Sequence, residues 1–328
     1  MWHRKMSHIL PWTILCYTLG GDFLLNLPSN NDELSLLKFM GKYQYINVND
    51  LKYFFKQNTY FKKRITNLLK NKYIRKIEQY YILTEKGMKY IRMLNYECIK
   101  VSRKSSYVPR LLYISNIAAY YNNCDTVSFI PSYELKDKEQ YTTTSRRYIG
   151  ILNINGTKYL TYHISKKHDN KYISSVIFDI NKEKIFQNII ILVDEITMIN
   201  YQDFIFGYNQ VIILEDTEEN REKLKGMNSI NWDRIIHEEY KKPYLSGHIY
   251  CDYEDAKGNY ISHFYFFDTE KINRINNFLN LNKEKYASII CSEELKQVLQ
   301  KIFSKAFYTV IDLEKNIDGK RTIYYEYE

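Results

Sequence analysis

The segment from Asn58 to Ile91 constrains the fold more than any other part of the chain. Its sequence, NTYFKKRITNLLKNKYIRKIEQYYILTEKGMKYI, changes from a helical spacing of apolar residues to a strand-like spacing and back. The first part has apolar residues at i, i+4, i+7 and i+8, which is one face of a helix: Phe61, Ile65, Leu68 and Leu69. Thr59 can cap this helix with its hydroxyl. We therefore expect a helix that turns one face to a core and the other to solvent.

The solvent face of this expected helix is polar and positively charged. It presents Tyr60, Lys63, Arg64, Asn67 and Lys70. Lysine and arginine can bind phosphates, and arginine and asparagine can also hydrogen-bond to the edges of bases. Such a face suits the major groove of a nucleic-acid duplex.

A hairpin and another helix are predicted after this helix. Tyr73 to Ile77 and Tyr80 to Leu83 are β-rich runs on either side of a polar Glu78-Gln79 tip, and the first run contains the basic pair Arg75-Lys76. Thr84 then opens a helix whose apolar stripe is Met88, Ile91 and Leu94. Gly87 leaves room for close packing of this helix.

Two further helices are expected upstream. The apolar residues Leu36, Leu37 and Phe39/Met40 indicate the first helix. The second is shorter, with Asn47 or Asn49 as its cap, and its apolar residues are Val48, Leu51, Phe54 and Phe55. Three short helices within about 40 residues predict a helix-turn-helix core.

These elements together resemble the winged helix-turn-helix family. ILTEKGMKYI stands where that family usually has a wing strand followed by a Leu-Thr-x-x-Gly helix start. The resemblance implies binding of double-stranded DNA, with the helix that begins near Thr59 in the major groove. Two alternatives stay open, because a basic amphipathic helix can be a solvated surface and some winged helices serve only in protein contacts.

The charge distribution favours a polyanionic partner. Residues 34–110 hold 18 Lys and Arg against 4 Asp and Glu, a balance of +14, whereas the whole chain carries +9. The rest of the chain is therefore net acidic. A region this positive should bind DNA with strong salt dependence, because each neutralised phosphate releases counterions.

Length and composition indicate a folded protein of two or three domains. The chain has 328 residues, of which 45% are hydrophobic and 16% aromatic, enough for packed cores. The five cysteines are scattered without a short pair, so neither a disulfide framework nor a zinc site is expected. A reducing cytoplasm fits this pattern.

The first 33 residues are expected to dock onto the core of the N-terminal domain. Arg4 and Lys5 precede an apolar run from Ile9 to Leu19, which superficially resembles a signal peptide. The run is too short to span a bilayer, and no small-x-small cleavage site follows Gly20-Gly21. We therefore expect neither export nor a membrane partner.

The remainder predicts an α/β domain. A polar linker from Lys100 to Pro109 suggests a boundary near residue 105, followed by a helix with apolar residues from Leu111 to Tyr121. The strands are expected at 127–130, 147–154, 158–164, 189–193, 211–214, 248–253, 260–267 and 321–328, and the helices at 218–225 and 292–305. Asn155-Gly156 is a strong hairpin signal between two of these strands.

The order of winged helix, linker, helix and hairpin sheet, with YIGILNINGTKYLTYHI in the hairpin, resembles the replication-relaxation family of mobile-element proteins from Gram-positive bacteria. The resemblance covers residues 34 to about 220 and implies a restriction-endonuclease-like sheet. Metal-binding carboxylates would be expected before the hairpin and on its second strand. This chain has none around Arg147 or from Tyr159 to His163, so the sheet would be a degenerate one without nuclease chemistry there.

A metal-dependent nuclease elsewhere is the main rival hypothesis. Asp125 and Glu134-Leu135-Lys136 match the pattern of an acid followed by acid-x-lysine that holds Mg²⁺ and orients water. His163 and His168 lack a third ligand nearby and indicate a surface loop rather than a metal site. A phosphate-binding glycine loop is absent from the sequence. We therefore expect no enzyme activity, no cofactor and no bound metal.

The sequence as a whole predicts an α/β protein in which an N-terminal winged helix-turn-helix precedes a larger mixed α/β domain. The expected domains are a docking segment at 1–33, a DNA-binding domain at 34–104 and a domain for dimerisation or partner binding at 105–328, for which a subdivision near 220–245 stays open.

We expect a cytoplasmic, sequence-specific DNA-binding protein that forms a homodimer. Its expected role is accessory or initiator protein, or regulator, in the replication, transfer or transcription of a mobile element such as a plasmid, together with replication or transfer proteins. A pure protein-interaction module is the remaining alternative. The residues expected to contact DNA are Thr59, Tyr60, Lys62, Lys63, Arg64, Asn67, Lys70, Arg75 and Lys76.

Overall fold

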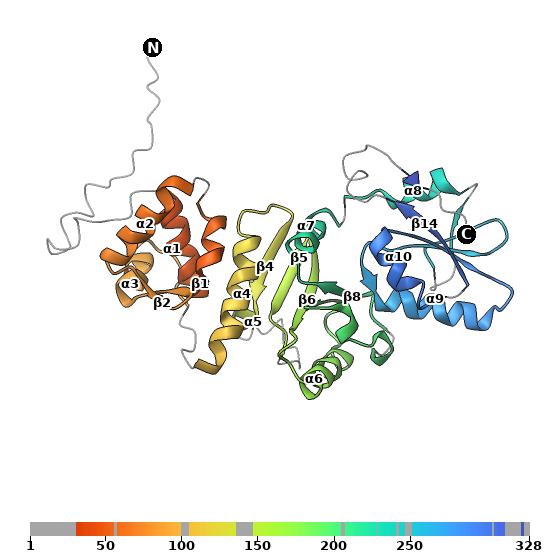
Figure 1. Cartoon of the computed structure of the whole chain (residues 1–328), viewed down its shortest axis with the longest axis horizontal. Coiled ribbons are helices and arrows are strands. Elements are labelled where there is room, and N and C mark those ends of the chain that lie inside the picture. The colour runs from red at the N-terminus through yellow and green to blue at the C-terminus, as the bar shows by residue number, and fades with distance from the viewer. Residues whose placement is uncertain are drawn as a thin grey trace, which may run out of the picture. The chain divides into compact units, whose positions relative to one another are not determined.

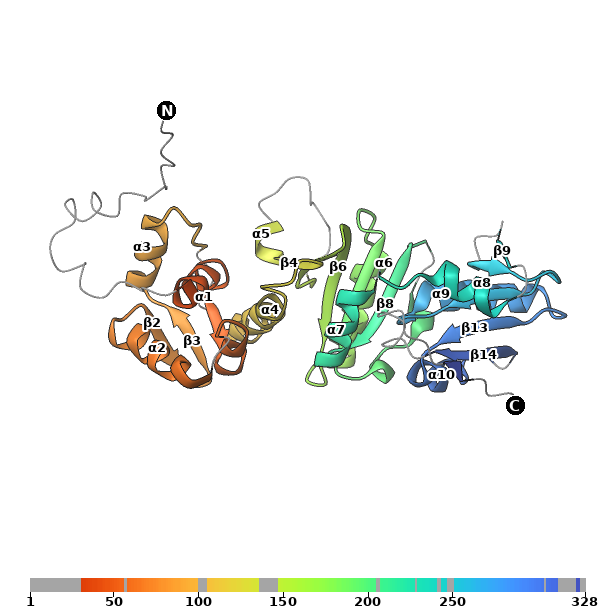
Figure 2. The same cartoon turned by 90° about the horizontal axis from the view of Figure 1, so that it is seen from above.

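The chain forms two compact units, Met1–Asn122 and Asn123–Glu328. Together they make a mixed α/β protein, which confirms the predicted fold class. Figures 1 and 2 show the elements of each unit in two orientations. The structure is a computed structural model, and it describes residues 31–55, 58–99, 105–135, 147–204, 207–227, 229–240, 243–246, 251–303, 305–311 and 323–324. Most of the predicted docking segment, residues 1–30, lies outside this range.

The N-terminal unit consists of helices around a small antiparallel sheet. Its elements, in chain order, are α1 (Asn31–Tyr43), β1 (Tyr45–Asn47), η1 (Val48–Tyr53), α2 (Asn58–Lys70), β2 (Ile74–Ile77), β3 (Tyr80–Leu83), α3 (Glu85–Met93), η2 (Ser105–Tyr107) and α4 (Val108–Tyr120). The strand order is β1-β3-β2, so β2 is an edge strand. The helices, the hairpin and the closing helix therefore appear in the predicted order, whereas β1 was not predicted. The first helix begins at Asn31, three residues before the predicted domain start.

Local hydrogen bonds explain where these helices begin and end. The side chain of Asn47 accepts a hydrogen bond from the Asn49 amide, so Asn47 is the cap of η1. At the end of α2, Lys72 has a positive φ, the Lys72 amide donates to Leu69 O, and the Tyr73 amide donates to Leu68 O. This pair of bonds is a Schellman motif, which stops a helix and turns the chain sharply. The chain thus leaves α2 directly into β2.

The start of α3 is tied to the end of α2. The Thr84 side chain accepts a hydrogen bond from the Gly87 amide at 3.1 Å, which confirms Thr84 as the cap. The Thr84 hydroxyl also lies 2.5 Å from Lys72 O. A β-carbon at Gly87 would lie 2.4 Å from Tyr73 O and 2.6 Å from Leu83 Cδ1, so only glycine fits this position. Gly87 therefore allows the close packing that its place in the sequence predicted.

Helix α4 belongs to the N-terminal unit, so the predicted boundary near residue 105 is wrong. The Ser115 hydroxyl donates to the carbonyl of Tyr45 in β1. The Asn116 amide donates to Asp50 Oδ1 at 2.7 Å. The unit boundary falls after Asn122 because these long-range contacts, which the local sequence pattern cannot reveal, join α4 to β1 and η1.

The first sheet of the C-terminal unit has the strand order β12-β8-β7-β6-β5-β4. Strands β4, β5 and β6 form an antiparallel meander, and β6, β7 and β8 are parallel. Asn155 and Gly156 both have positive φ in the turn between β5 and β6, as predicted. The bounds are β4 Val127–Pro131, β5 Gly150–Ile154, β6 Thr157–Ile164, β7 Asn188–Val193, β8 Gln210–Glu215 and β12 Phe267–Asp268. Short helices accompany this sheet: α5 Ser132–Leu135, α6 Asn170–Asn181, η4 Ile196–Met198, η5 Tyr201–Asp203 and α7 Glu218–Gly226.

The second sheet has the order β15-β14-β13-β11-β10-β9, with β11, β13 and β14 parallel. Its strands are β9 Tyr244–Leu245, β10 Tyr253–Glu254, β11 Tyr260–His263, β13 Ala287–Cys291, β14 Ala306–Ile311 and β15 Ile323–Tyr324. Its helices are α8 Trp232–Glu239, α9 Thr269–Leu281 and α10 Glu293–Leu299. Strands β13 and β14 and helix α9 were not predicted, and the helix expected at 292–305 ends at Leu299.

One apolar core joins the two sheets of the C-terminal unit. It takes Tyr162 and Ile191 from the first sheet, Tyr260 and Ile289 from the second, and Ile275 from α9, all of them buried. Helix α6 packs on this side of the first sheet, and α7 lies on the opposite side (Figure 1). The unit is therefore continuous, and the subdivision near 220–245 is not found.

Candidate nucleic-acid interface

The exposed face of α2 carries a row of polar and basic side chains. Tyr60, Lys63, Asn67 and Lys70 are all exposed, and their spacing of i, i+3, i+7 and i+10 places them on one side of the helix. Tyr60 retains 61% of its surface. The opposite side holds the buried residues of α2. No acidic residue occurs from 58 to 77, so α2 and β2 add no negative charge of their own to the row.

Two other residues that were predicted to contact DNA, Lys62 and Thr59, are not members of this row. Lys62 is exposed but lies toward the margin of the helix. Thr59 was expected to cap the helix, but α2 already begins at Asn58 and Thr59 is within its first turn. A capping residue needs a non-helical backbone, so Thr59 is not the cap.

Arg64 lies at the other margin of α2 and is half-buried. Its guanidinium forms an ion pair with Asp32 of α1. Partly exposed ion pairs contribute on the order of 0–1 kcal/mol, so this pair orients α2 against α1 more than it stabilises the unit. Arg64 therefore does not belong to the freely exposed row, contrary to the expectation from helical spacing.

The hairpin adds two predicted basic residues. Arg75 and Lys76 are exposed on β2, the edge strand of the small sheet. Neighbouring residues of a strand point to opposite faces, so the two side chains extend from opposite sides of the edge. Glu78, at the tip of the hairpin, has a positive φ and follows Ile77, the last residue of β2.

The basic residues of α3 contributed to the predicted net charge, but none of them was predicted to contact DNA. Lys89 and Arg92 are exposed on this helix, and the Lys86 ammonium lies 4.9 Å from the centre of the Tyr73 ring. A helix of the N-terminal unit other than α2 thus adds positive charge. A search for exposed basic positions on every predicted helix would have found it.

The residues of the rival nuclease hypothesis do not converge. Asp125 precedes β4, whereas Glu134 lies in α5 after the end of that strand. Five strand residues span roughly 15 Å, which is too far for two carboxylates to share one metal ion. Lys136 lies outside the described residues. Within those residues, no group of three His, Cys, Asp or Glu side chains is arranged to hold a metal ion.

His163 near the end of β6 and His168 in the loop after it are held by packing and hydrogen bonds. The His163 and His168 rings are 6.1 Å apart, His168 stacks on Tyr172, and His168 Nδ1 accepts a hydrogen bond from the Ser165 amide. Burial lowers the pKa of His163 to about 4, although the charges of Asp216 and Asp194 oppose this shift. His163 is therefore neutral at pH 7.

The partly buried His163 gives the C-terminal unit a pH-dependent stability. As the pH falls below about 6.5, this histidine becomes protonated first in the unfolded chain, while the folded chain resists protonation until about pH 4. We expect the free energy of unfolding to fall by up to about 3 kcal/mol over this window. Urea unfolding at a series of pH values should show a shallower fall for His163→Gln. The exposed His237 gives the control, since an equally shallow fall for His237→Gln would contradict this assignment.

Comparison with known proteins identifies no relative of this chain. No family model, no curated protein and no solved structure matches it. Among the described residues, no helix combines the length and the apolar character needed to cross a membrane. The proposed function is therefore based on the geometry of the two units.

Proposed function

We propose that residues 31–99 form a winged helix-turn-helix module that binds double-stranded DNA. The order helix, strand, short helix, helix, hairpin and helix, together with the sheet order β1-β3-β2, supports this class of fold. In such modules the helix before the hairpin enters the major groove. That helix is α2 in this chain.

The row of exposed side chains on α2 carries the proposal. Lys63 and Lys70 are about two turns apart and reach phosphates, while Asn67 between them can hydrogen-bond to adenine. The edge strand β2 brings Arg75 and Lys76 to the phosphates beside the groove. Arg64, held by Asp32, keeps α2 in place rather than reading bases.

Asn67 is the residue of this row best suited to distinguish one sequence from another. An asparagine contact to a base contributes about 1–3 kcal/mol of discrimination, whereas lysine contacts to phosphates are independent of sequence. We expect Asn67→Ala to reduce the preference for the cognate site about tenfold or more and to leave nonspecific binding intact. Gel-shift titrations with cognate and scrambled duplexes measure both affinities. Thr66→Ala is a matched control because Thr66 is exposed on the flank of the same helix.

The biological setting proposed for this module is the replication, transfer or transcription of a mobile element. The resemblance that the sequence pattern of residues 34 to about 220 suggests to replication-relaxation proteins is the ground for this setting, and the C-terminal unit would then provide contacts to a second copy or to partner proteins. Genome-wide and plasmid-wide footprinting of bound DNA tests this role. Sites at an origin, at a transfer region or at promoters would distinguish the three processes, and paired half-sites would indicate a dimer. Sites scattered without relation to any of them would contradict the proposal.

A further inference from the structure

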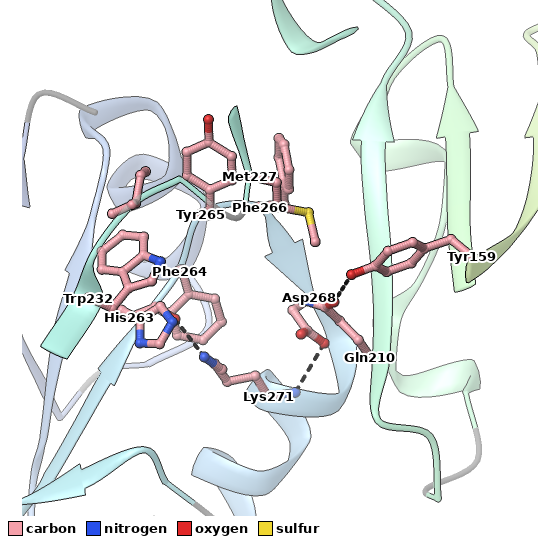
Figure 3. A pocket seen from close by; sticks show the side chains of 11 residues that line it. Tyr159, Gln210, Met227, Trp232, His263, Phe264, Tyr265, Phe266, Asp268 and Lys271 are labelled. Atoms are coloured by element: carbon pink, nitrogen blue, oxygen red, sulfur yellow. Dashed lines mark hydrogen bonds between the residues drawn. The ribbon is translucent and has the colours of Figure 1, made fainter. Parts of the chain in front are cut away.

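The C-terminal unit contains a pocket of about 310 Å³ between its two sheets. Figure 3 shows Trp232 and His263 on one side of it, and Tyr159, Gln210 and Asp268 on the other. The volume lies at the lower end of the ~300–1,000 Å³ range of small-molecule sites. The pocket therefore has room for a single small ligand rather than a polymer segment.

One side of the pocket is built from stacked rings. His263 lies parallel to Trp232, with ring centres 4.3 Å apart and planes 21° apart, and Tyr265 meets the same indole edge-on. Phe264 and Phe266 extend this apolar side. Aromatic walls of this kind favour flat, unsaturated ligands, because ring faces stack on one another.

The other side of the pocket offers hydrogen-bonding groups. The Tyr159 hydroxyl donates to Gln210 Oε1 at 3.0 Å, and this bond fixes the orientation of the amide. The side chain of Gln210 in turn hydrogen-bonds to the buried Asp268, which caps α9. Burial raises the pKa of Tyr159 to about 12, so the hydroxyl keeps its proton at neutral pH. A polar edge with both donors and acceptors thus faces the stacked rings.

The charges around the pocket are already compensated. Lys271 Nζ lies 2.9 Å from Asp252 Oδ2 and donates to the carbonyl of His263 at 2.8 Å. Asp268 Oδ1 accepts hydrogen bonds from the Glu270 and Lys271 amides at the start of α9. Neither charge needs a counterion from a ligand. The chemistry therefore disfavours a phosphate or a free carboxylate and favours a neutral molecule.

We propose that this pocket binds a nucleobase, stacked beside Trp232 and hydrogen-bonded to the Gln210 edge. A nucleobase is flat, neutral and lined with donors and acceptors, which are the three properties that the walls select. The base can come from a free nucleoside or from an unpaired nucleotide of a strand. The proposal does not depend on DNA binding by the N-terminal unit.

The first test titrates the full chain with adenosine, guanosine, cytidine and thymidine by calorimetry. We expect saturable binding of at least one nucleoside, a dissociation constant raised at least tenfold by Trp232→Ala, and an altered preference among bases for Gln210→Leu. Phe307→Ala removes an exposed ring outside the pocket and should leave binding unchanged. Near-ultraviolet circular dichroism and thermal melting check that each variant is folded, and Trp232→Phe, which keeps a ring, should retain part of the affinity.

A second arm distinguishes the two sources of the base. Short single-stranded oligonucleotides are titrated into the Lys63→Glu/Lys70→Glu variant, in which the N-terminal unit contributes little to nucleic-acid binding. Binding of free nucleosides supports a soluble ligand, and Trp232-dependent binding of oligonucleotides alone supports a base presented by a strand. No binding in either arm at millimolar concentrations, or binding that Trp232→Ala leaves unchanged, would overturn the proposal.

Discussion

Reversing the charges of Lys63 and Lys70 is expected to lower the affinity of the chain for duplex DNA about 100-fold or more at roughly 0.1 M salt. Both side chains are exposed on α2, and neither has an acidic partner among the described residues. Each lost phosphate contact reduces the slope of log affinity against log salt by about 0.9, and each new glutamate repels the DNA phosphates. The slope of log affinity against log salt should become shallower by about two.

The experiment measures duplex binding by fluorescence anisotropy over a salt series. Lys166→Glu/Lys167→Glu is the matched control, because it makes the same change in net charge at two adjacent exposed lysines of the C-terminal unit. If the control variant loses as much affinity as the α2 variant, only the overall charge matters and α2 is not the contact surface.

A different experiment tests the nuclease hypothesis. Cleavage of supercoiled plasmid with Mg²⁺ or Mn²⁺, abolished by Glu134→Ala, would favour that hypothesis over DNA binding alone.

Gly87→Ala is expected to destabilise the N-terminal unit by about 1–3 kcal/mol, the usual cost of forcing one extra carbon into a packed site. The added β-carbon would lie 2.4 Å from the carbonyl oxygen of Tyr73, which is backbone and cannot rotate away. Helix α3 would have to move from the hairpin, and the bond from the Gly87 amide to Thr84 would weaken. The positions of β2 and α2 would change with it, so DNA binding should fall as well.

Hydrogen exchange followed by mass spectrometry measures this effect locally in the full chain. Peptides from the hairpin and α3 should exchange faster in Gly87→Ala, whereas peptides from β7 and β8 should be unchanged. Lys89→Ala alters an exposed residue of the same helix and serves as the control. Protection in α3 equal to that of the unchanged protein would show that the helix accommodates the β-carbon.

The sequence predicted the N-terminal unit better than the C-terminal unit because its signals are local. The helix with Ile65 and Leu68 on its buried face, the Thr84 cap and the Glu78-Gln79 turn each depend on residues a few positions apart. The Asn155-Gly156 turn was predictable for the same reason. The three residues of β1 were missed, because so short a strand is defined by its pairing with β3 rather than by its own pattern.

The candidate sites show the same division. Exposure of Lys63, Asn67 and Lys70 follows from helical spacing, so the sequence alone could identify them. The partner of Arg64 lies 32 residues away in α1, and no local pattern indicates that it is engaged. The pocket beside Trp232 was missed entirely, because Tyr159, Gln210 and Asp268 come from three separate strands.

The sequence by itself determined the order of helices and hairpin in the N-terminal unit and the concentration of positive charge there, because periodicity and charge are properties of neighbouring residues. Only the tertiary structure decided that α4 packs on β1, that β13 and β14 complete a second sheet, and that Arg64 is held by Asp32. These features depend on contacts between residues far apart in the chain. These contacts are stabilised by burial and pairing that arise only when distant elements pack together, so the spacing of residues along the chain does not predict them.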